Sequence, residues 1–169
     1  MRIKAKIAVL VLALAFVCHG CGIYTFSGAS IPAEAKTVSV AYFPNQAQLV
    51  NPMLSNDFTT ALRDAMMNQT PLDMVDEGGD LAFEGEITDY RTTPVAITAA
   101  QTAAMNRLTI TVKVRFSNRF DETKDFEQSF SHYEDYPSDQ DLNAVQDGLT
   151  PVIIEALVED IFNKALVNW

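Results

Sequence analysis

One segment of the sequence constrains the fold more than any other. Residues 107–116 read RLTITVKVRF, in which apolar residues at every second position alternate with threonine, lysine and arginine. Successive side chains of a strand point to opposite faces of its sheet. The alternation therefore predicts a strand with one face in the core and one face in water, as in a sheet that is covered on one side only.

Four other segments have the composition or the period of strands. Apolar residues again favour every second position in two of them, whereas another is only a short apolar run. Gly78 and Gly79 predict a turn between two of these strands, and Gly85 predicts a bulge or the close approach of another backbone. The predicted strands are 36–43, 72–75, 81–90 and 125–133.

Two segments carry apolar residues at steps of three and four positions, which is typical of a helix that buries one face. The first runs to about Gln69 and is expected to begin with Asn51 as its N-cap and Pro52 at its first helical position. The second begins near Ser138, an N-cap candidate with Asp141 in the first turn, and reaches the C-terminus.

Two further prolines affect the boundaries of these elements. Pro151 interrupts the second helix, so that the helix either kinks or is replaced by a new helix with Thr150 as its cap. Residues 92–106 contain Pro94 and many small residues, and we expect them to form a loop with frayed strand ends.

The order of these elements predicts the architecture. One strand, a helix, four strands and a final helix favour an α+β fold. We expect a two-layer α/β sandwich, with two helices packed on one face of a largely antiparallel, four- to five-stranded sheet. The chain shows no internal repeat, so residues 37–169 are predicted to form a single domain.

The first 20 residues resemble an export signal rather than a part of the fold. Arg2, Lys4 and Lys6 precede an apolar run at residues 7–17. This run is too short to span a bilayer comfortably and is typical of a signal peptide. A short membrane-anchor helix is the alternative.

The two cysteines of the chain follow this apolar run directly. Cys21 comes after the small residue Gly20, as the cysteine of a bacterial lipoprotein does at its cleavage site, although Cys18 and His19 depart from the usual lipobox. A redox pair is the weaker interpretation, because no thioredoxin-like pattern surrounds the cysteines. We therefore expect residues 1–20 to be removed, Cys21 to be acylated, and residues 21–36 to form a lipidated tether.

Charge and composition exclude several classes of function. The formal net charge of −10, which becomes −13 when residues 1–20 are lost, argues against binding of nucleic acid. Two histidines and two cysteines leave little for a metal site made of those ligands. The sequence contains neither a glycine-rich nucleotide loop nor a G-x-S-x-G nucleophile elbow. We expect no catalytic residue, no metal and no cofactor.

Two polar groups allow a chemical role but favour a structural one. His132 is a general-base candidate, yet a lone histidine beside strand aromatics is more often structural. Asp76, Glu77 and Asp80 flank the glycine turn without the spacing of a calcium loop, so a solvated turn is the favoured interpretation.

Positive charge is concentrated in one predicted hairpin. Five of the nine lysines and arginines that follow Cys21 lie within residues 107–124, which contain only two acidic residues. Such a patch is able to meet phosphates or an acidic partner. An equally good interpretation is a solvated sheet face whose charges protect the edge. The five residues are Arg107, Lys113, Arg115, Arg119 and Lys124.

The lipoprotein signal is followed by six strings that are spread over the whole mature chain. They read CGIYTFSGASIP, TVSVAYFPN, FEGEITDY, NRLTITVKVRF, FEQSFSHYEDY and LVEDIFNKALVNW. Together they resemble the LPS-assembly lipoprotein LptE family, in its Bacteroidetes-type branch.

The resemblance implies a function as well as a fold. It implies a non-enzymatic α/β sandwich that acyl chains hold in the outer membrane, facing the periplasm. Members of this family plug the lumen of the LptD-type β-barrel, assist its assembly and deliver lipopolysaccharide to the cell surface. Some bind lipopolysaccharide through basic residues, so the five residues of the basic hairpin are candidate contacts for lipopolysaccharide or for the barrel.

Two other functions stay open on the sequence alone. A periplasm-facing lipid-carrier lipoprotein would bind an apolar ligand between the sheet and the helices. A hydrolase would use His132.

Overall fold

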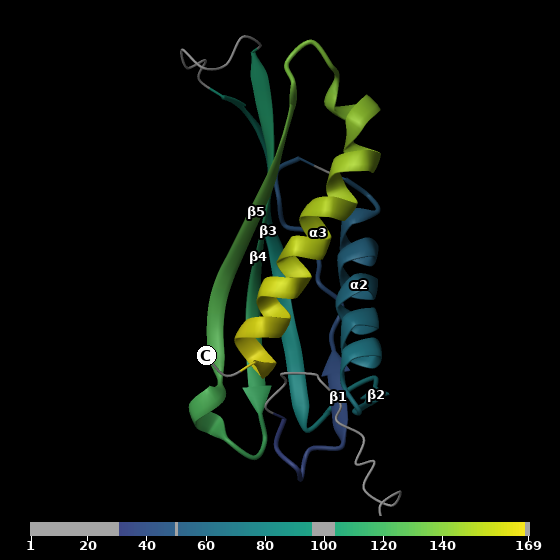
Figure 1. Cartoon of the computed structure of the whole chain (residues 1–169), viewed down its shortest axis with the longest axis vertical. Helices are drawn as coiled ribbons and strands as arrows, with labels where there is room; N and C mark the ends of the chain where they lie inside the picture. Colours follow the sequence, from purple (N-terminus) through teal and green to yellow (C-terminus); the bar gives the residue numbers. More distant parts are fainter. Residues whose placement is uncertain (1–30, 50, 96–103, 168–169) are drawn as a thin grey trace, which may run out of the picture.

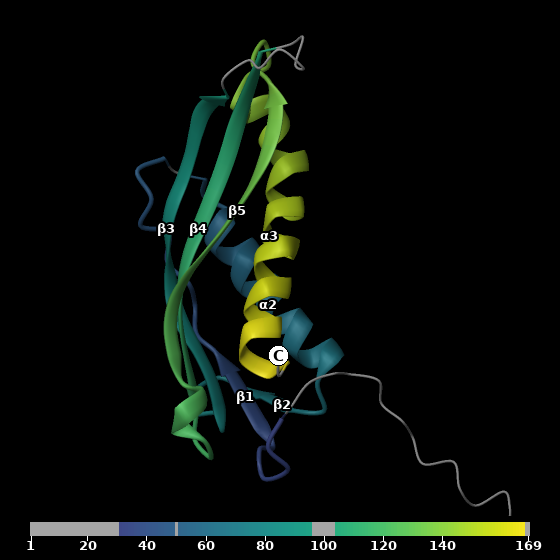
Figure 2. The same cartoon turned by 60° about the vertical axis from the view of Figure 1, so that its left-hand side comes forward.

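The protein is a two-layer α+β sandwich, as predicted. The computed structural model describes residues 31–49, 51–95 and 104–167. Figure 2 shows the sheet as one layer and both long helices as the other, on a single face of the sheet. In chain order the elements are β1 (Thr37–Val40), α2 (Leu54–Gln69), β2 (Asp73–Val75), β3 (Leu81–Val95), β4 (Met105–Asn118), the 3-10 turn η1 (Glu122–Lys124), β5 (Phe126–Pro137) and α3 (Leu142–Leu166).

The sheet is mixed but mostly antiparallel. Its five strands lie in the order β2-β1-β3-β4-β5, in which β1 runs parallel to both of its neighbours. The long strands β3, β4 and β5 form two antiparallel pairs. α2 packs over β1 and β2, and α3 runs along β4 and β5 (Figure 1). The predicted signal peptide, Cys21 and most of the predicted tether lie outside the described residues.

The β3–β4 hairpin is longer than the sequence predicts. The sequence predicts a loop with frayed strand ends over 92–106, but β3 continues to Val95 and β4 begins at Met105. Residues 96–103 of this segment lie outside the described residues. Pro94 is accommodated opposite Asn106 because β1 and the chain after it pair with β3 only as far as Ile87. Beyond that point β3 is an edge strand, where a missing N–H group is tolerated.

Gly85 marks a close approach, which is one of the two alternatives that the sequence offered. A Cβ atom at this position would lie 2.0 Å from the carbonyl oxygen of Lys113 and 2.7 Å from Cε1 of Phe43. The ring of Phe43 is fully buried and packs on Phe58 of α2, with 5.1 Å between the ring centroids. The irregularity in the β3–β4 register lies elsewhere, between Ile87 and Asp89.

The start of α2 corrects the predicted cap. The helix begins at Leu54, and its N-cap is Met53, which makes no side-chain capping bond. Oδ1 of Asn51 instead accepts a hydrogen bond of 3.1 Å from the N–H of Met53, so Asn51 stabilises the turn before the helix. Pro52 belongs to this turn and not to the first helical turn. The predicted end of the helix at Gln69 is confirmed.

The second helix is continuous, so the alternative in which a new helix begins at Pro151 is wrong. α3 begins after Asp141, whose carboxylate caps it, and runs through Pro151 without a break. Ser138 is not the cap, because it lies three residues before Asp141; its N–H donates to the carbonyl of Ala104. Thr150 lies inside the helix, and its buried hydroxyl has no hydrogen-bond partner among the described residues.

The core is one continuous cluster between the sheet and the two helices. The alternating apolar residues of β4, from Leu108 to Phe116, are fully buried or nearly so, as their alternation predicts. Aromatic rings from three strands extend the cluster toward η1, with centroid distances of 4.9 Å, 5.4 Å and 6.2 Å along Phe83, Phe116, Phe126 and Phe130. The main helical contributions are Leu54, Phe58, Leu62 and Met66 of α2 and Ile153, Leu157, Ile161 and Leu166 of α3.

Asp80 fastens the turn before β3 to the start of β1. Its Oδ2 accepts hydrogen bonds from the N–H groups of Lys36 at 2.9 Å and Thr37 at 3.2 Å. The bond from Lys36 is the main reason that the pKa of Asp80 lies below its usual value. Asp76 and Glu77 of the same turn are exposed. The described residues contain no group of histidine, cysteine and acidic side chains that could hold a metal ion.

Replacing Gly85 with alanine should destabilise the protein, because the new methyl group would overlap the backbone of β4. We expect the free energy of unfolding to fall by about 1–3 kcal/mol, measured by urea unfolding. Gly148→Ala in α3 is the matched control, since nothing lies within 4 Å of its Cβ position. That change should raise the free energy of unfolding by about 0.5–1 kcal/mol. Equal effects of the two changes would contradict the proposed steric role of Gly85.

Replacing Asp80 with asparagine should remove a stabilising charge that depends on pH. Because the folded state lowers the pKa of Asp80, the charge stabilises the protein above the unfolded pKa of about 3.9. This contribution is lost as the pH falls through the folded pKa. The difference in unfolding free energy between the wild type and Asp80→Asn should therefore be constant near neutral pH and shrink as the pH falls below the unfolded pKa of about 3.9. Asp76→Asn, in the exposed part of the turn, is the control and should match the wild type at pH 7.

Candidate functional site

The face of the sheet that the helices leave uncovered is polar, and we call it the open face. It is formed by the odd-numbered residues of β4 and their cross-strand neighbours on β3 and β5. Arg107, Lys113 and Arg115 lie on it, while the even-numbered residues of β4 point into the core. The strand register thus brings three of the five predicted contact residues onto one surface.

Arg107 is held by two neighbours on β5. Its Nε and Nη2 donate to the two carboxylate oxygens of Asp135 at 2.7 Å and 2.9 Å. The guanidinium carbon lies 3.5 Å from the ring centroid of Tyr133. The hydrogen bonds from Arg107 lower the pKa of Asp135. A bidentate pair of this kind fixes the planar guanidinium and leaves it little freedom to meet another anion.

Lys113 and Arg115 also lie near carboxylates, and the contact of Arg115 is the longer of the two. Lys113 forms an ion pair with Glu127 of β5, and this contact lowers the pKa of Glu127. Nη1 of Arg115 lies 3.9 Å from Oε2 of Glu84 on β3, at the limit of an ion pair. The side chain of Arg115 is 64% exposed, against 33% for Arg107.

The other two candidates lie at the end of the hairpin and not on the strands. Arg119 follows β4, and its Nη1 lies 3.7 Å from Oδ1 of Asp80, with 72% of the side chain exposed. Lys124 is the last residue of η1. Figure 1 shows η1 at the lower end of the sheet, where β4 and β5 are joined.

The positive charge of the hairpin is therefore balanced by carboxylates that the sequence interpretation did not pair with it. Glu84 comes from β3, and Glu127 and Asp135 come from β5, outside the basic segment itself. The sequence contained a signal that could have predicted these pairs. Pairing β4 with β5 as a hairpin places Arg107 opposite Asp135 and Arg115 opposite Glu127. Opposite charges at directly facing positions are typical of stable antiparallel pairs.

His132 connects the edge strand to a helix. Its Nε2 lies 2.7 Å from Oδ2 of Asp160 in α3, and the two side chains are 36% and 54% exposed. A histidine on β5 that pairs with one helical carboxylate fits the structural interpretation that the sequence favoured.

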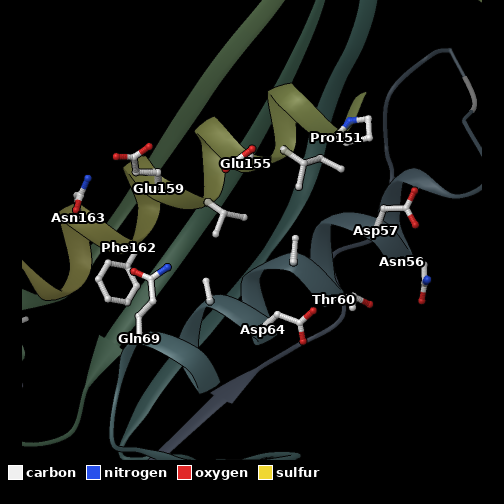
Figure 3. Close-up of a pocket in the computed structure, with 14 residues that line it drawn as sticks. Asn56, Asp57, Thr60, Asp64, Gln69, Pro151, Glu155, Glu159, Phe162 and Asn163 are labelled. Carbon is white, nitrogen blue, oxygen red and sulfur yellow. The ribbon is translucent and has the colours of Figure 1, made fainter. Parts of the chain in front are cut away.

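A groove of about 790 Å³ lies between the two helices (Figure 3). Residues of α2 and α3 alone line it, so it belongs to the helical layer and not to the space between helices and sheet. It is therefore not the cavity that a lipid carrier of the predicted kind requires. Its floor is apolar and includes Ala61, Val158 and Phe162, while carboxylates stand along both sides.

Within the described part of the chain, no helix is long and apolar enough to cross a membrane. α3 is the longest helix of that part, with 25 residues, and it carries charged residues along its outer side.

Several solved structures share this fold. The hypothetical protein CT253 from Chlamydia trachomatis matches with a TM-score of 0.56 and 9% identity, over 79% of this chain and 99% of that one. A minor lipoprotein from Acinetobacter baumannii matches with a TM-score of 0.51 and 13% identity, over 77% and 91% of the two chains. An uncharacterized lipoprotein B from Nitrosomonas europaea matches with a TM-score of 0.51 and 13% identity, over 85% and 88%.

The sequence comparison identifies the family directly. No curated protein matches the sequence. The model of the LptE family, described as lipopolysaccharide-assembly, matches residues 35–165, which span every helix and strand of the structure except the last residue of α3. The chain therefore belongs to the lipopolysaccharide-assembly family LptE.

Proposed function

We propose that this protein is an outer-membrane lipoprotein that plugs an LptD-type β-barrel, helps to assemble it and so serves the delivery of lipopolysaccharide to the cell surface. The observation that carries the proposal is the family match over residues 35–165. The role is one of binding and assembly and not of catalysis, and it needs no cofactor. Cys21 carries the acyl anchor, on the periplasmic side of the membrane.

The open face has the character that a plug requires. The lumen of a large outer-membrane barrel is polar and hydrated, so a plug must present a polar surface to it. The open face does so along the long strands β3, β4 and β5, where threonine, serine and paired charges alternate with the buried row. An acyl chain and a tether would keep the plug close to its barrel and raise its effective concentration there.

Two of the basic residues are readily available to a new anion. Among the four whose ion pairs are described above, Arg115 and Arg119 make the longest pairs, at 3.9 Å and 3.7 Å, and have the most exposed side chains. Exposed pairs of this length contribute little to stability, so exchanging the carboxylate for a phosphate or an acidic lumen residue costs little. Arg107 is less available than these two, because its Nε–Nη2 edge is bonded to Asp135 and its face lies against the ring of Tyr133. Lys113 and Lys124 complete the proposed contact surface.

The wild-type protein should bring a large β-barrel with it when it is purified from outer membranes in a mild detergent. Reversing the charge in the triple variant Lys113→Glu, Arg115→Glu and Arg119→Glu should reduce the recovered barrel by about tenfold, because the lumen or the lipopolysaccharide phosphates would then be repelled. Sensitivity of the cells to large antibiotics measures the integrity of the outer membrane in parallel. Purification of the wild type without any barrel would contradict the proposed plug.

A variant with the two charges of an ion pair exchanged distinguishes a loss of barrel contact from a loss of protein stability. The double variant Lys113→Glu with Glu127→Lys keeps an ion pair between β4 and β5 while it moves the positive charge to the edge strand. Thermal unfolding of all variants shows whether the fold survives. If the triple variant folds and still recovers the wild-type amount of barrel, these basic residues are not the contact surface.

Cys21→Ser should abolish incorporation of radiolabelled fatty acid into the protein, because the sulfur is the acylation site, whereas Cys18→Ser should leave labelling unchanged. Gel mobility of the two variants reports whether the signal is still removed. Labelling that survives in Cys21→Ser and disappears in Cys18→Ser would place the anchor, and the cleavage, three residues earlier.

A further inference from the structure

The groove between α2 and α3 has an apolar floor and an acidic rim. Ala61, Ala65, Ile154, Val158 and Phe162 form the floor, and all but Ala61 are buried. Asp57 and Asp64 of α2 and Glu155 and Glu159 of α3 form the rim, and all four are exposed. Figure 3 shows these carboxylates rising from both helices around the apolar side chains.

Among the described residues, the carboxylates of the rim form no ion pair, unlike the paired carboxylates of the open face. The ion pairs of Arg91, Arg107, Lys113, Arg115 and Arg119 use other acidic residues. Arg63, the basic residue of α2, turns to the carbonyl of Val40 on β1, and Lys164 lies over the ring of Phe126. Glu155 and Glu159 stand one helical turn apart, a like-charge spacing that slightly destabilises a helix.

This combination selects one kind of occupant. An apolar floor favours a ligand with an apolar stripe, and a rim of four carboxylates favours positive charge on both sides of that stripe. Anionic lipid headgroups, including phosphates, would be repelled by the same rim. The residues that line the groove cover about four helical turns of each helix, or roughly 20 Å, which is the length of a short helical peptide.

We propose that the α2–α3 groove docks a basic, amphipathic helical segment of a partner protein, with the apolar stripe of that segment on the alanine, valine and phenylalanine floor. Helix-in-groove recognition of this type uses anchors at helical spacing for affinity and flanking charges for orientation. The proposal goes beyond the proposed function, because it holds whether the segment belongs to the barrel or to another protein.

The test uses the chain from residue 22 onward, which lacks the acyl group and avoids detergent. It contains the whole described core, because every buried residue of the cluster lies between Ala35 and Leu166. The probe is a fluorescent peptide of lysine and leucine, about 14 residues long to match the groove, with its leucines on one helical face. A second peptide keeps the leucines and replaces each lysine with glutamate. Binding is followed by fluorescence anisotropy at low and high salt.

The lysine–leucine peptide should bind, its affinity should fall as salt is added, and the glutamate–leucine peptide should not bind. Asp64→Lys with Glu155→Lys should weaken binding by about tenfold or more. The matched control, Asp76→Lys with Glu77→Lys, changes the net charge equally in an exposed turn outside the groove and should leave the affinity within about twofold of the wild type. Ala61→Phe should fill the floor and weaken binding without changing the charge.

Three results would overturn the proposal. Equal binding of the two peptides would show that the rim does not select charge. Equal losses in the rim and turn variants would show that only net charge attracts the peptide. Binding of a fluorescent fatty acid that Ala61→Phe blocks, without binding of the lysine–leucine peptide, would assign the groove to an apolar ligand. Circular dichroism of each variant confirms that the fold is intact.

Discussion

The burial of one face of β4 is the constraint on which the rest of this structure depends. Leu108, Ile110, Val112 and Val114 are fully buried, and the strand pairs along its length with β3 on one side and β5 on the other. Because side chains alternate along a strand, burying this row under the helical layer sends every other residue to the opposite face. A one-residue slip would exchange the two sets, so the buried row also fixes the register that brings the charges of the open face together.

The same constraint explains which predictions from the sequence succeeded. Alternation along residues 107–116 was enough to place β4 with one face in the core, and together with the apolar stripes of both helices it predicted that the helices share that face. The rarity of glycine inside a strand left two interpretations of Gly85, a bulge or a close approach, and the close approach is confirmed. In each case a pattern within a short segment indicated which residues of that segment are packed against the rest of the protein.

The wrong predictions concern the ends of helices and strands and the hydrogen-bond partners of side chains, which a pattern within one segment does not reveal. Pro94 suggested a loop because a proline disfavours a central strand, and only the strand order reveals that β3 has become an edge there. Ser138 resembled a cap, yet the helix begins three residues later, and the carboxylate of Asp141 is its cap. Asp80 was expected to be solvated, because its backbone donors lie more than 40 residues away in the sequence. The groove is a product of two helices and could not be predicted from either one.

The open face of the sheet and the α2–α3 groove differ in how their charges are balanced. Each surface therefore favours a partner of a different charge. On the open face Glu84, Glu127 and Asp135 each form an ion pair with a basic residue. An anionic ligand would have to displace a weak pair, such as that of Arg115, before it binds. In the groove the carboxylates already face outward around an apolar floor, so a basic ligand gains attraction without breaking a pair. An anionic ligand would thus meet exposed arginines on one side and be repelled by carboxylates on the other. A domain with this asymmetry has a defined orientation with respect to an anionic ligand even before it makes a specific contact.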